Sequence, residues 1–126
     1  MYTPYVTETE YFDMGYSVIP AEDLKKVLTK ASRNIDGLTF NRIVSKGFEH
    51  LTDFQKEIVK TCVCEQADFL YSNADALASV LSKYSINSVS MEFGTGFNVA
   101  MENGIPVQKT VYTLLEQTGL CWRGAI

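Results

Sequence analysis

Apolar residues recur at helical spacing in the first third of the chain. From Pro20 to about Leu38 they form a stripe only about 100° wide, which predicts a helix with one buried face. The stripe consists of Leu24, Val27, Leu28, Ala31, Ile35 and Leu38. Pro20 suits the first helical position, and the acidic residues that follow complement the positive end of the helix dipole. Gly37 should weaken the helix end, and residues 38–44 should form an irregular or helical turn.

A second helix is predicted from Asp53 to about Ser72. Thr52 and Gln55 have the spacing of a capping box, which marks its start. Its apolar residues cover an arc of roughly 200°, so it should be a central helix. The arc holds Phe54, Ile58, Val59, Cys62, Val63, Ala67, Phe69 and Leu70. The pattern leaves open whether the same chain or another subunit covers this arc.

Gln66 projects into the middle of that arc. A buried amide without partners costs about 1 to 3 kcal/mol, so its side chain should bond to backbone carbonyls or to a neighbouring helix. The alternative is a contact between subunits.

The second half of the chain predicts shorter elements. A short helix fits residues 73–83, with Asn73 or Asp75 as its cap. Residues 88–93 then alternate between polar and apolar, Gly94-Thr95-Gly96 can turn the chain, and Phe97, Val99 and Met101 can form a return strand, which predicts a hairpin near 86–101. Asn103-Gly104 breaks this pattern. Pro106 should start the last helix, and Gly119 should end it in a left-handed conformation with Leu120 folded back.

The N-terminal residues show no sustained helical period but are rich in aromatic side chains, namely Tyr2, Tyr5, Tyr11 and Phe12. Such a segment should pack on the body or on a neighbour. The fold expected is mainly α: a small bundle of three to four helices with one β-hairpin and an extended N-terminal arm. It forms a single domain, with the arm at 1–18, the helical core at 19–120 and a C-terminal tail at 121–126.

Composition and charge narrow the function classes. The chain has 126 residues, of which 46% are hydrophobic and 21% charged, as in an ordinary globular domain. No apolar run approaches the roughly 20 residues of a membrane span, and the first residues are acidic rather than basic, so a cytosolic protein without membrane contact is expected. A net charge of −4 disfavours binding to nucleic acid.

The charge is unevenly distributed. Residues 16–46 hold six basic and three acidic side chains, whereas residues 47–75 hold six acidic side chains against two lysines. The two segments should therefore pair either within one chain or across copies.

Residues suited to catalysis or metal binding are sparse. His50, the single histidine, is expected to be an exposed loop residue beside Glu49. Cys62 and Cys64 would project about 200° apart on a helix and cannot hold one metal ion; Cys62 should be core, and Cys64 should lie on a polar or inter-element face. Three cysteines give no disulfide framework, and Cys121 has no base near it in the sequence. No catalytic, metal-binding or cofactor-binding residue is predicted, and no enzyme activity.

Particular phrases of the sequence carry a resemblance. They are Ile19-Pro20 leading to Ala31-Ser32-Arg33-Asn34-Ile35-Asp36; Thr39-Phe40-Asn41-Arg42-Ile43; Gln66-Ala67-Asp68-Phe69-Leu70-Tyr71; Tyr84-Ser85-Ile86; and Leu114-Leu115 followed by Thr118-Gly119-Leu120 and Arg123-Gly124. With these phrases, from Tyr5 to Gly124, the chain resembles the head-to-tail connector (adaptor or neck) proteins of long-tailed bacteriophages and prophages. The region from Met91 to Met101 departs from the family pattern.

The resemblance implies a structural virion subunit. Copies would form a ring, expected to be a dodecamer, between the portal and the tail, joining head to tail and lining the DNA conduit after packaging. The partners implied are other copies, the portal protein and an adjacent neck or tail-completion protein, with DNA only as passing cargo. The protein would reside in the host cytoplasm before assembly and at the head–tail interface of the virion afterwards.

Candidate contacts follow from the resemblance and the charge pattern. The portal or neck contacts expected are Trp122, Arg123, Tyr5, Tyr11 and Phe12. The contacts expected between copies are the basic Lys25, Lys26, Lys30 and Arg33 and the acidic Glu57, Glu65 and Asp68.

Two other readings stay open. One is a different phage neck or tail-completion protein, or a generic helical interaction module. The other is a small helix-turn-helix regulator, which the acidic charge and the long connection between the first two helices disfavour.

Overall fold

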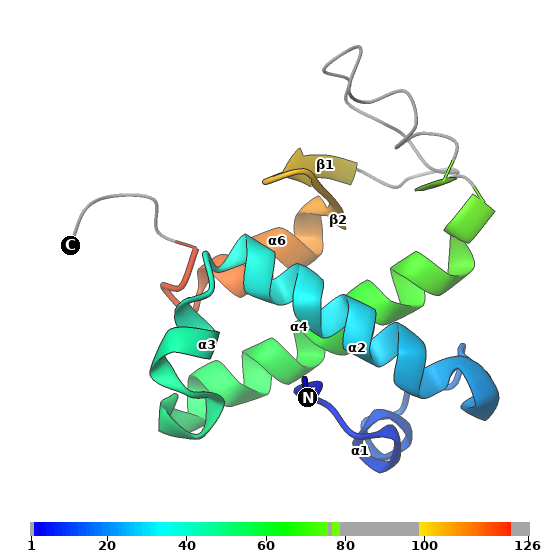
Figure 1. The fold of residues 1–126 in the computed structure, drawn as a ribbon, viewed down its shortest axis with the longest axis horizontal. Coiled ribbons are helices and arrows are strands. Elements are labelled where there is room, and N and C mark those ends of the chain that lie inside the picture. Colours follow the sequence, from blue (N-terminus) through cyan, green and yellow to red (C-terminus); the bar gives the residue numbers. More distant parts are fainter. Residues whose placement is uncertain (1, 76, 79–98, 122–126) are drawn as a thin grey trace.

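The computed structural model describes residues 2–75, 77–78 and 99–121. It is mainly helical with one antiparallel hairpin, as the sequence predicts (Figure 1). In chain order the elements are α1 (Glu8–Asp13), α2 (Ala21–Leu38), α3 (Arg42–Lys46), the 3-10 turn η1 (Phe48–His50), α4 (Asp53–Ser72), β1 (Val99–Glu102), β2 (Ile105–Gln108) and α6 (Lys109–Glu116).

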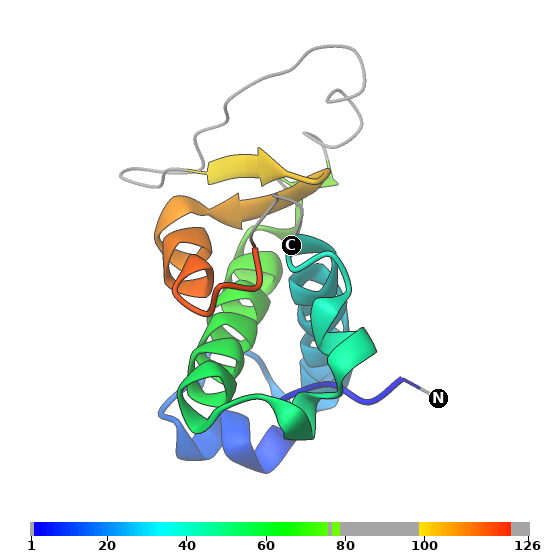
Figure 2. The ribbon, with the colours of Figure 1, turned by 90° about the vertical axis from the view of Figure 1, so that its left-hand side faces the viewer.

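The helix pair α2 and α4 forms the centre of the fold. The two helices cross (Figure 1), and α2 buries the predicted stripe against α4, with only Val27 partly exposed. Helix α4 lies between α2 and α6 (Figure 2) and also contacts β2. Its broad apolar arc is therefore covered by its own chain, except at Phe54, which is 57% exposed.

Local sequence explains where these helices start and end. Thr52 and Gln55 form the predicted capping box at the start of α4. Pro20 lies at the N-cap of α2 in an extended conformation, one position before the predicted one. The helix continues through Gly37 to Leu38, and the missing side chain at Gly37 makes room for the hairpin: a Cβ there would lie 2.6 Å from Cδ1 of Ile105.

The described hairpin differs from the predicted one. Val99 and Met101 belong to its first strand, β1, and pair with Gln108 and Pro106 of β2. Val99 and Met101 lie in a strand, as predicted, and the residues before them that the prediction pairs with it lie outside the described ranges. The prediction that Pro106 starts a helix was wrong, since α6 begins only at Lys109. The other parts of the predicted hairpin, including Gly94-Thr95-Gly96, lie outside the described residues.

The Asn103-Gly104 turn explains this difference. Both residues have positive φ, 53° and 78°, which is the conformation of a two-residue hairpin turn that suits the twist of the flanking strands. Glu102 and Ile105 flank the turn as a pair, and the next pair, Met101 and Pro106, needs no N–H from the proline. A proline is therefore compatible with this position in the strand.

The N-terminal segment packs back on the body. It contains the short helix α1, which the sequence analysis did not predict, and Thr7 and Glu10 form a capping box at its start. Helix α1 lies beneath α2 and α4 in Figure 2. Val6, Tyr11 and Ile19 are fully buried, so this segment is part of the core rather than a free arm.

Two further predicted features are the helix after α4 and the end of the last helix. Residues 74, 75, 77 and 78 are helical and Leu77 is buried, while most of the predicted helix at 73–83 lies outside the described residues. After α6, Gly119 has a φ of +78° and Leu120 is buried, which confirms the predicted left-handed residue and the fold-back.

Candidate functional site

Four tyrosines of the N-terminal segment donate hydrogen bonds to carboxylates of the central helix pair. Tyr2 and Tyr5 both donate to Asp36 of α2, over 2.7 and 2.5 Å. Tyr11 donates to Oδ1 of Asp68 over 2.5 Å, and Tyr16 donates to Oε2 of Glu65 over 2.7 Å. We call this set the tyrosine–carboxylate clamp, because it attaches residues 2–16 to both α2 and α4.

Burial favours the protonated form of the clamp tyrosines. It is the main reason that the pKa of each hydroxyl is raised, in the case of Tyr11 to about 12, and the neighbouring carboxylates raise these pKa values further. Burial also raises the pKa of Asp68, although the hydrogen bond from Tyr11 opposes that shift. At neutral pH the tyrosines are therefore neutral donors.

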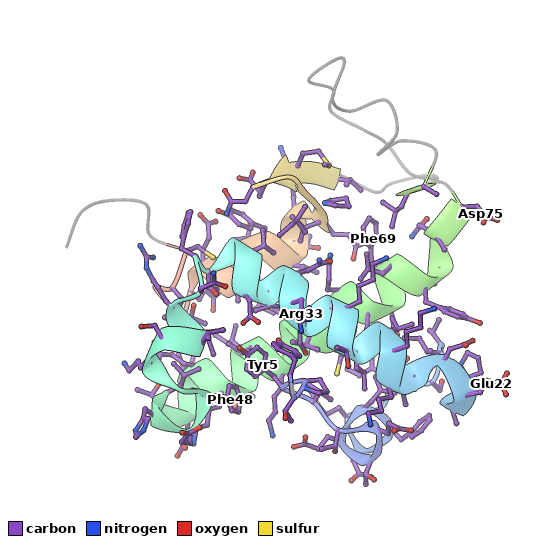
Figure 3. All side chains as sticks on the ribbon, viewed as in Figure 1. Tyr5, Glu22, Arg33, Phe48, Phe69 and Asp75 are labelled. Carbon is purple, nitrogen blue, oxygen red and sulfur yellow. The ribbon has the colours of Figure 1, made fainter. Side chains whose placement is uncertain are left out.

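The clamp changes the status of several predicted contact residues. Tyr11 is fully buried and Tyr5 is half-buried, with its ring stacked on Phe48 at 5.0 Å between centroids (Figure 3). Glu65 and Asp68 accept hydrogen bonds within the chain. Four residues proposed for contacts with other subunits therefore have partners within the chain: Tyr5, Tyr11, Glu65 and Asp68. Phe12, by contrast, is 46% exposed. Trp122 and Arg123 lie outside the described residues.

A second polar contact joins the helix pair to the hairpin. Gln66 is fully buried, as predicted, and its Nε2 donates to Oδ1 of Asn34 over 2.9 Å and to the carbonyl of Pro106 over 3.0 Å. Gln55 donates to the carbonyl of Thr118 over 2.9 Å, and Arg42 donates to that of Leu120 over 2.8 Å. Side-chain amides and a guanidinium thus attach β2 and the segment after α6 to the helices.

The outward face of α2 is basic. Lys26 and Arg33 are exposed and project roughly 150° or more away from the buried stripe, and exposed Lys25 and Lys30 flank them at roughly 110° on either side. We call these four residues the basic strip. The Arg33 guanidinium lies 4.2 Å from the centre of the Tyr2 ring, a cation–π contact. Among the described residues, no ion pair joins segment 16–46 to segment 47–75.

A shallow groove of about 390 Å³ lies between α1 and α4. We call it the α1–α4 groove; it is lined by Glu10, Asp13, Met14, Lys56, Glu57 and Lys60. Glu10 forms an ion pair with Lys60, which lowers the pKa of the Glu10 carboxyl. Met14 is 38% exposed, and its Sδ lies 4.0 Å from Sγ of Cys64. The groove therefore combines an apolar residue with carboxylates that have no basic partner in the described chain, those of Asp13 and Glu57.

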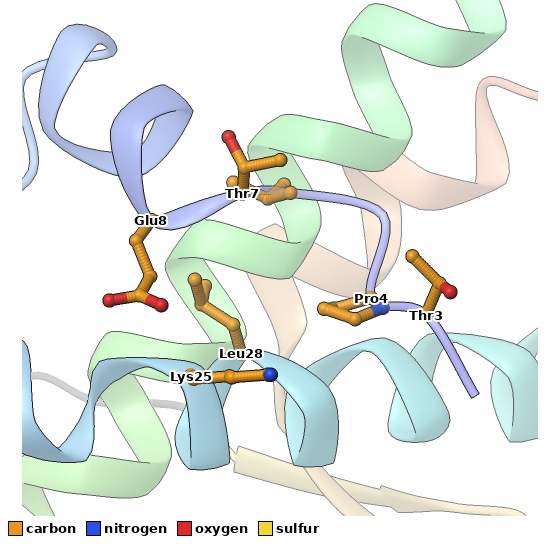
Figure 4. A pocket seen from close by; sticks show the side chains of 7 residues that line it. Thr3, Pro4, Thr7, Glu8, Lys25 and Leu28 are labelled. Carbon is orange, nitrogen blue, oxygen red and sulfur yellow. The ribbon is translucent and has the colours of Figure 1, made fainter. Parts of the chain in front are cut away.

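Two further hollows are smaller than the α1–α4 groove. The first, about 230 Å³, lies between the N-terminal segment and α2 and is lined mostly by apolar atoms, with Glu8 and Lys25 among its seven residues (Figure 4). The second, about 260 Å³, lies between α2, α4 and the hairpin, beside Asn34 and Pro106. Neither hollow is lined by a cysteine or histidine that would act as a nucleophile or a base.

The residues with catalytic side-chain chemistry lie apart. His50 is exposed, as predicted, with 68% of its side chain accessible. Cys62 and Cys64 are buried, and burial raises the pKa of each thiol to about 12, so both stay protonated. In the described part of the chain no three His, Cys, Asp or Glu side chains are grouped to hold a metal ion, and none of its helices has the length and apolarity of a membrane span.

Sequence reasoning found the buried Gln66 but missed the clamp. The sequence assigns no bonding partner to Asp36 and does not single out Tyr16. The only available signal was the density of tyrosines near the N-terminus, because the carboxylates that receive them are 31 to 57 residues away in sequence. Comparisons of the chain with protein-family models, curated proteins and solved structures give no match.

Proposed function

We propose that the chain is a structural subunit of a phage or prophage neck. Its copies would form a ring between the portal and the tail, join head to tail and line the DNA conduit. This proposal assigns no chemical step to the chain. Its functional surfaces are those that contact other copies and neighbouring virion proteins.

One observation carries the proposal: the phrases that resemble connector proteins include the residues that hold this fold together. Ser32 and Asp36, in the first phrase, receive the N-terminal segment. Gln66 and Asp68, in another, bind the hairpin and Tyr11. Because the resemblance includes residues that make structural contacts, it supports a fold shared between this chain and the connector proteins.

Thr118-Gly119-Leu120, part of the last of these phrases, fits the same pattern. The carbonyls of Thr118 and Leu120 receive Gln55 and Arg42, so this phrase fixes the last described turn of the chain, which precedes Trp122 in the sequence. A tail that docks on another protein needs a fixed origin, because an ordered start lowers the entropy lost on binding. The contacts at Thr118 and Leu120 therefore support a docking role for the C-terminal tail.

Reconstitution with the portal protein encoded by the same genome tests this function. The expected result is a complex with several copies of the chain per portal ring, visible as an added ring in electron micrographs and as a heavier species in sedimentation. Deletion of the gene should leave packaged heads and free tails unjoined. Normal joined particles after the deletion would refute the proposal.

A different neck or tail-completion role is the second candidate. The same reconstitution separates it from the first, because a tail-completion protein would be captured by tail-tube proteins and not by the portal.

A further inference from the structure

The basic strip on α2 and the α1–α4 groove lie on different sides of the molecule. Lys26 and Arg33 project away from α4, and Lys30 borders the hollow between α2, α4 and the hairpin. The groove is bounded by α1 and by a different part of α4, at Lys56, Glu57 and Lys60. In Figure 2, α2 and α4 stand side by side with α1 beneath them. Within one chain the strip cannot reach the groove. Two surfaces placed in this way are suited to a heterologous contact, in which each copy uses one surface toward each neighbour.

The charges of the two surfaces are complementary. The strip carries four positive charges, and none of its four residues forms an ion pair with a described carboxylate. In the groove, Glu10 and Lys60 neutralise each other, which leaves Asp13 and Glu57 against Lys56. Asp53 on α4 is exposed and adds negative charge to that helix, whereas Glu8 lies on the side of α1 that faces Lys25.

The shapes of the side chains also match. Lysine can lay its methylene stem along an apolar surface while its ammonium stays at the polar edge. Met14, which is exposed in the groove, offers such a surface, and Asp13 and Glu57 offer carboxylates nearby. Two lysines one helical turn apart, Lys26 and Lys30, are suited to this arrangement.

We infer that the basic strip of one copy docks in the α1–α4 groove of the next, with Lys26 and Lys30 facing Asp13 and Glu57. The inference rests on the proposed ring and specifies which surfaces form its subunit contact. It replaces Glu65 and Asp68, which the clamp engages, with Asp13 as an acidic partner and retains Glu57. A second copy of the chain is the occupant, because the contact needs both surfaces and each copy supplies both.

A charge exchange between two variants tests this contact. Lys26→Glu with Lys30→Glu makes the strip acidic, and Asp13→Lys with Glu57→Lys makes the groove basic. Each variant alone should associate at least about tenfold more weakly than the wild type, because both of its contacts would join like charges. An equimolar mixture should recover association, because the acidic strip of one variant then meets the basic groove of the other. The association is measured by sedimentation velocity, with and without portal rings.

Matched controls keep the number of charge changes constant. Lys46→Glu with Lys109→Glu, and Glu49→Lys with Glu116→Lys, alter exposed residues away from both surfaces and should leave association within about twofold of the wild type. Higher salt should weaken the wild-type contact, since its charges are near the surface. Thermal melting of every variant verifies that the fold is retained.

Zero-length cross-linking gives an independent readout. A carbodiimide joins lysine amines to nearby carboxylates, and a mixture of 15N-labelled and unlabelled chains identifies the links between copies. Links from Lys26 or Lys30 to Asp13 or Glu57 are expected. Recovery absent from the mixed variants, or no wild-type association in either condition, would overturn the inference.

The outcomes also separate this contact from the proposed function. Rings that form on the portal but are insensitive to the charge exchange would leave the neck function standing and place the subunit contact elsewhere. Loss of portal binding with unchanged self-association would assign the strip to the portal. A wild-type chain that does not bind the portal at all would contradict the neck function itself.

Discussion

Tyr11 makes the most buried contact of the tyrosine–carboxylate clamp. Its side chain is fully buried, and its hydroxyl donates to Asp68 and also accepts from the backbone N–H of Ile19 over 3.2 Å. Tyr2, Tyr5 and Tyr16 are only half-buried, so water can replace their partners at lower cost. The free energy that the clamp contributes should therefore be concentrated at Tyr11.

Replacement of Tyr11 by phenylalanine tests this distribution. The ring remains in place, but Asp68 and the N–H of Ile19 lose a partner, which should lower the free energy of unfolding by about 1 to 3 kcal/mol. Urea unfolding followed by circular dichroism measures the loss. Tyr71→Phe is the matched control, because Tyr71 is 37% exposed and its loss of a hydroxyl should change stability by less than about 0.5 kcal/mol. A loss of unfolding free energy in Tyr11→Phe as small as the loss in Tyr71→Phe would show that the Tyr11 hydroxyl contributes nothing to stability.

Glu10 gives a prediction for pH. Its ion pair with Lys60 holds the folded-state pKa below the unfolded value of 4.5, so the stabilisation is present above pH 4.5 and is lost as the pH falls through the lower folded-state value. Glu10→Gln keeps an acceptor for the capping box at Thr7 and removes only the charge. Because the pair is partly exposed, the variant should be less stable by about 0.2 to 1 kcal/mol at pH 7.

Measurement of both proteins at two pH values separates the charge from the cap. The difference in unfolding free energy between wild type and Glu10→Gln should shrink as the pH falls below 4.5. The raised pKa of Asp68 has the opposite effect on stability, but it is common to both proteins and cancels in the difference. A difference that is independent of pH in this acidic range would mean that Glu10 acts through the cap and not through Lys60.

At the level of elements, hydrophobic period predicted what depends on local sequence. The stripe of α2 and the capping box and broad arc of α4 each specify a helix without reference to the rest of the chain. Helix α1 was missed because six residues are too few for a period, although Thr7 and Glu10 have the capping-box spacing. The hairpin formed by β1 and β2 is not predicted because alternation is given more weight than the Asn103-Gly104 turn, which is the stronger short-range signal.

Contacts between elements that are distant in the sequence could not be predicted from it. The burial of Gln66 followed from its position on the arc of α4, but its acceptors, Asn34 and the carbonyl of Pro106, depend on how three elements meet. The same holds for the acceptors of the clamp tyrosines. A hydrophobic pattern states which face is buried and leaves the partner unspecified.

Gln66 is the side chain that joins α4 to both α2 and β2, which gives a prediction at this scale. Gln66→Met keeps the approximate size of the side chain but leaves the Pro106 carbonyl without its donor, so the free energy of unfolding should fall by about 1 to 3 kcal/mol. Amide exchange in β1 and β2 should accelerate more than exchange in α1. Gln117→Met, at an exposed position, is the control and should leave both measurements nearly unchanged.

At the scale of the whole molecule, the hydrogen-bonded side chains of the clamp and of Gln66 lie inside the fold, and the charged side chains without an ion pair lie on its surface. The clamp and Gln66 attach the N-terminal segment and the hairpin to the helix pair, while the basic strip and the α1–α4 groove remain open on different sides. Tyr5 and Tyr11 are engaged inside the chain, so Phe12 is the N-terminal aromatic residue with the most exposed side chain among the predicted portal contacts. Trp122 and Arg123 form the other predicted portal surface.

These two predicted portal surfaces can be separated by substitution. Trp122→Ala with Arg123→Ala should weaken capture by the portal at least about tenfold, because aromatic and arginine side chains contribute most of the binding energy in many interfaces. The substitutions leave in place the contacts of Arg42 and Gln55 with Leu120 and Thr118, and thermal melting verifies that the fold is retained. Phe12→Ala removes the exposed N-terminal ring in the same assay. If only Phe12→Ala reduces capture, the portal contacts the face formed by α1, and the C-terminal tail has another partner.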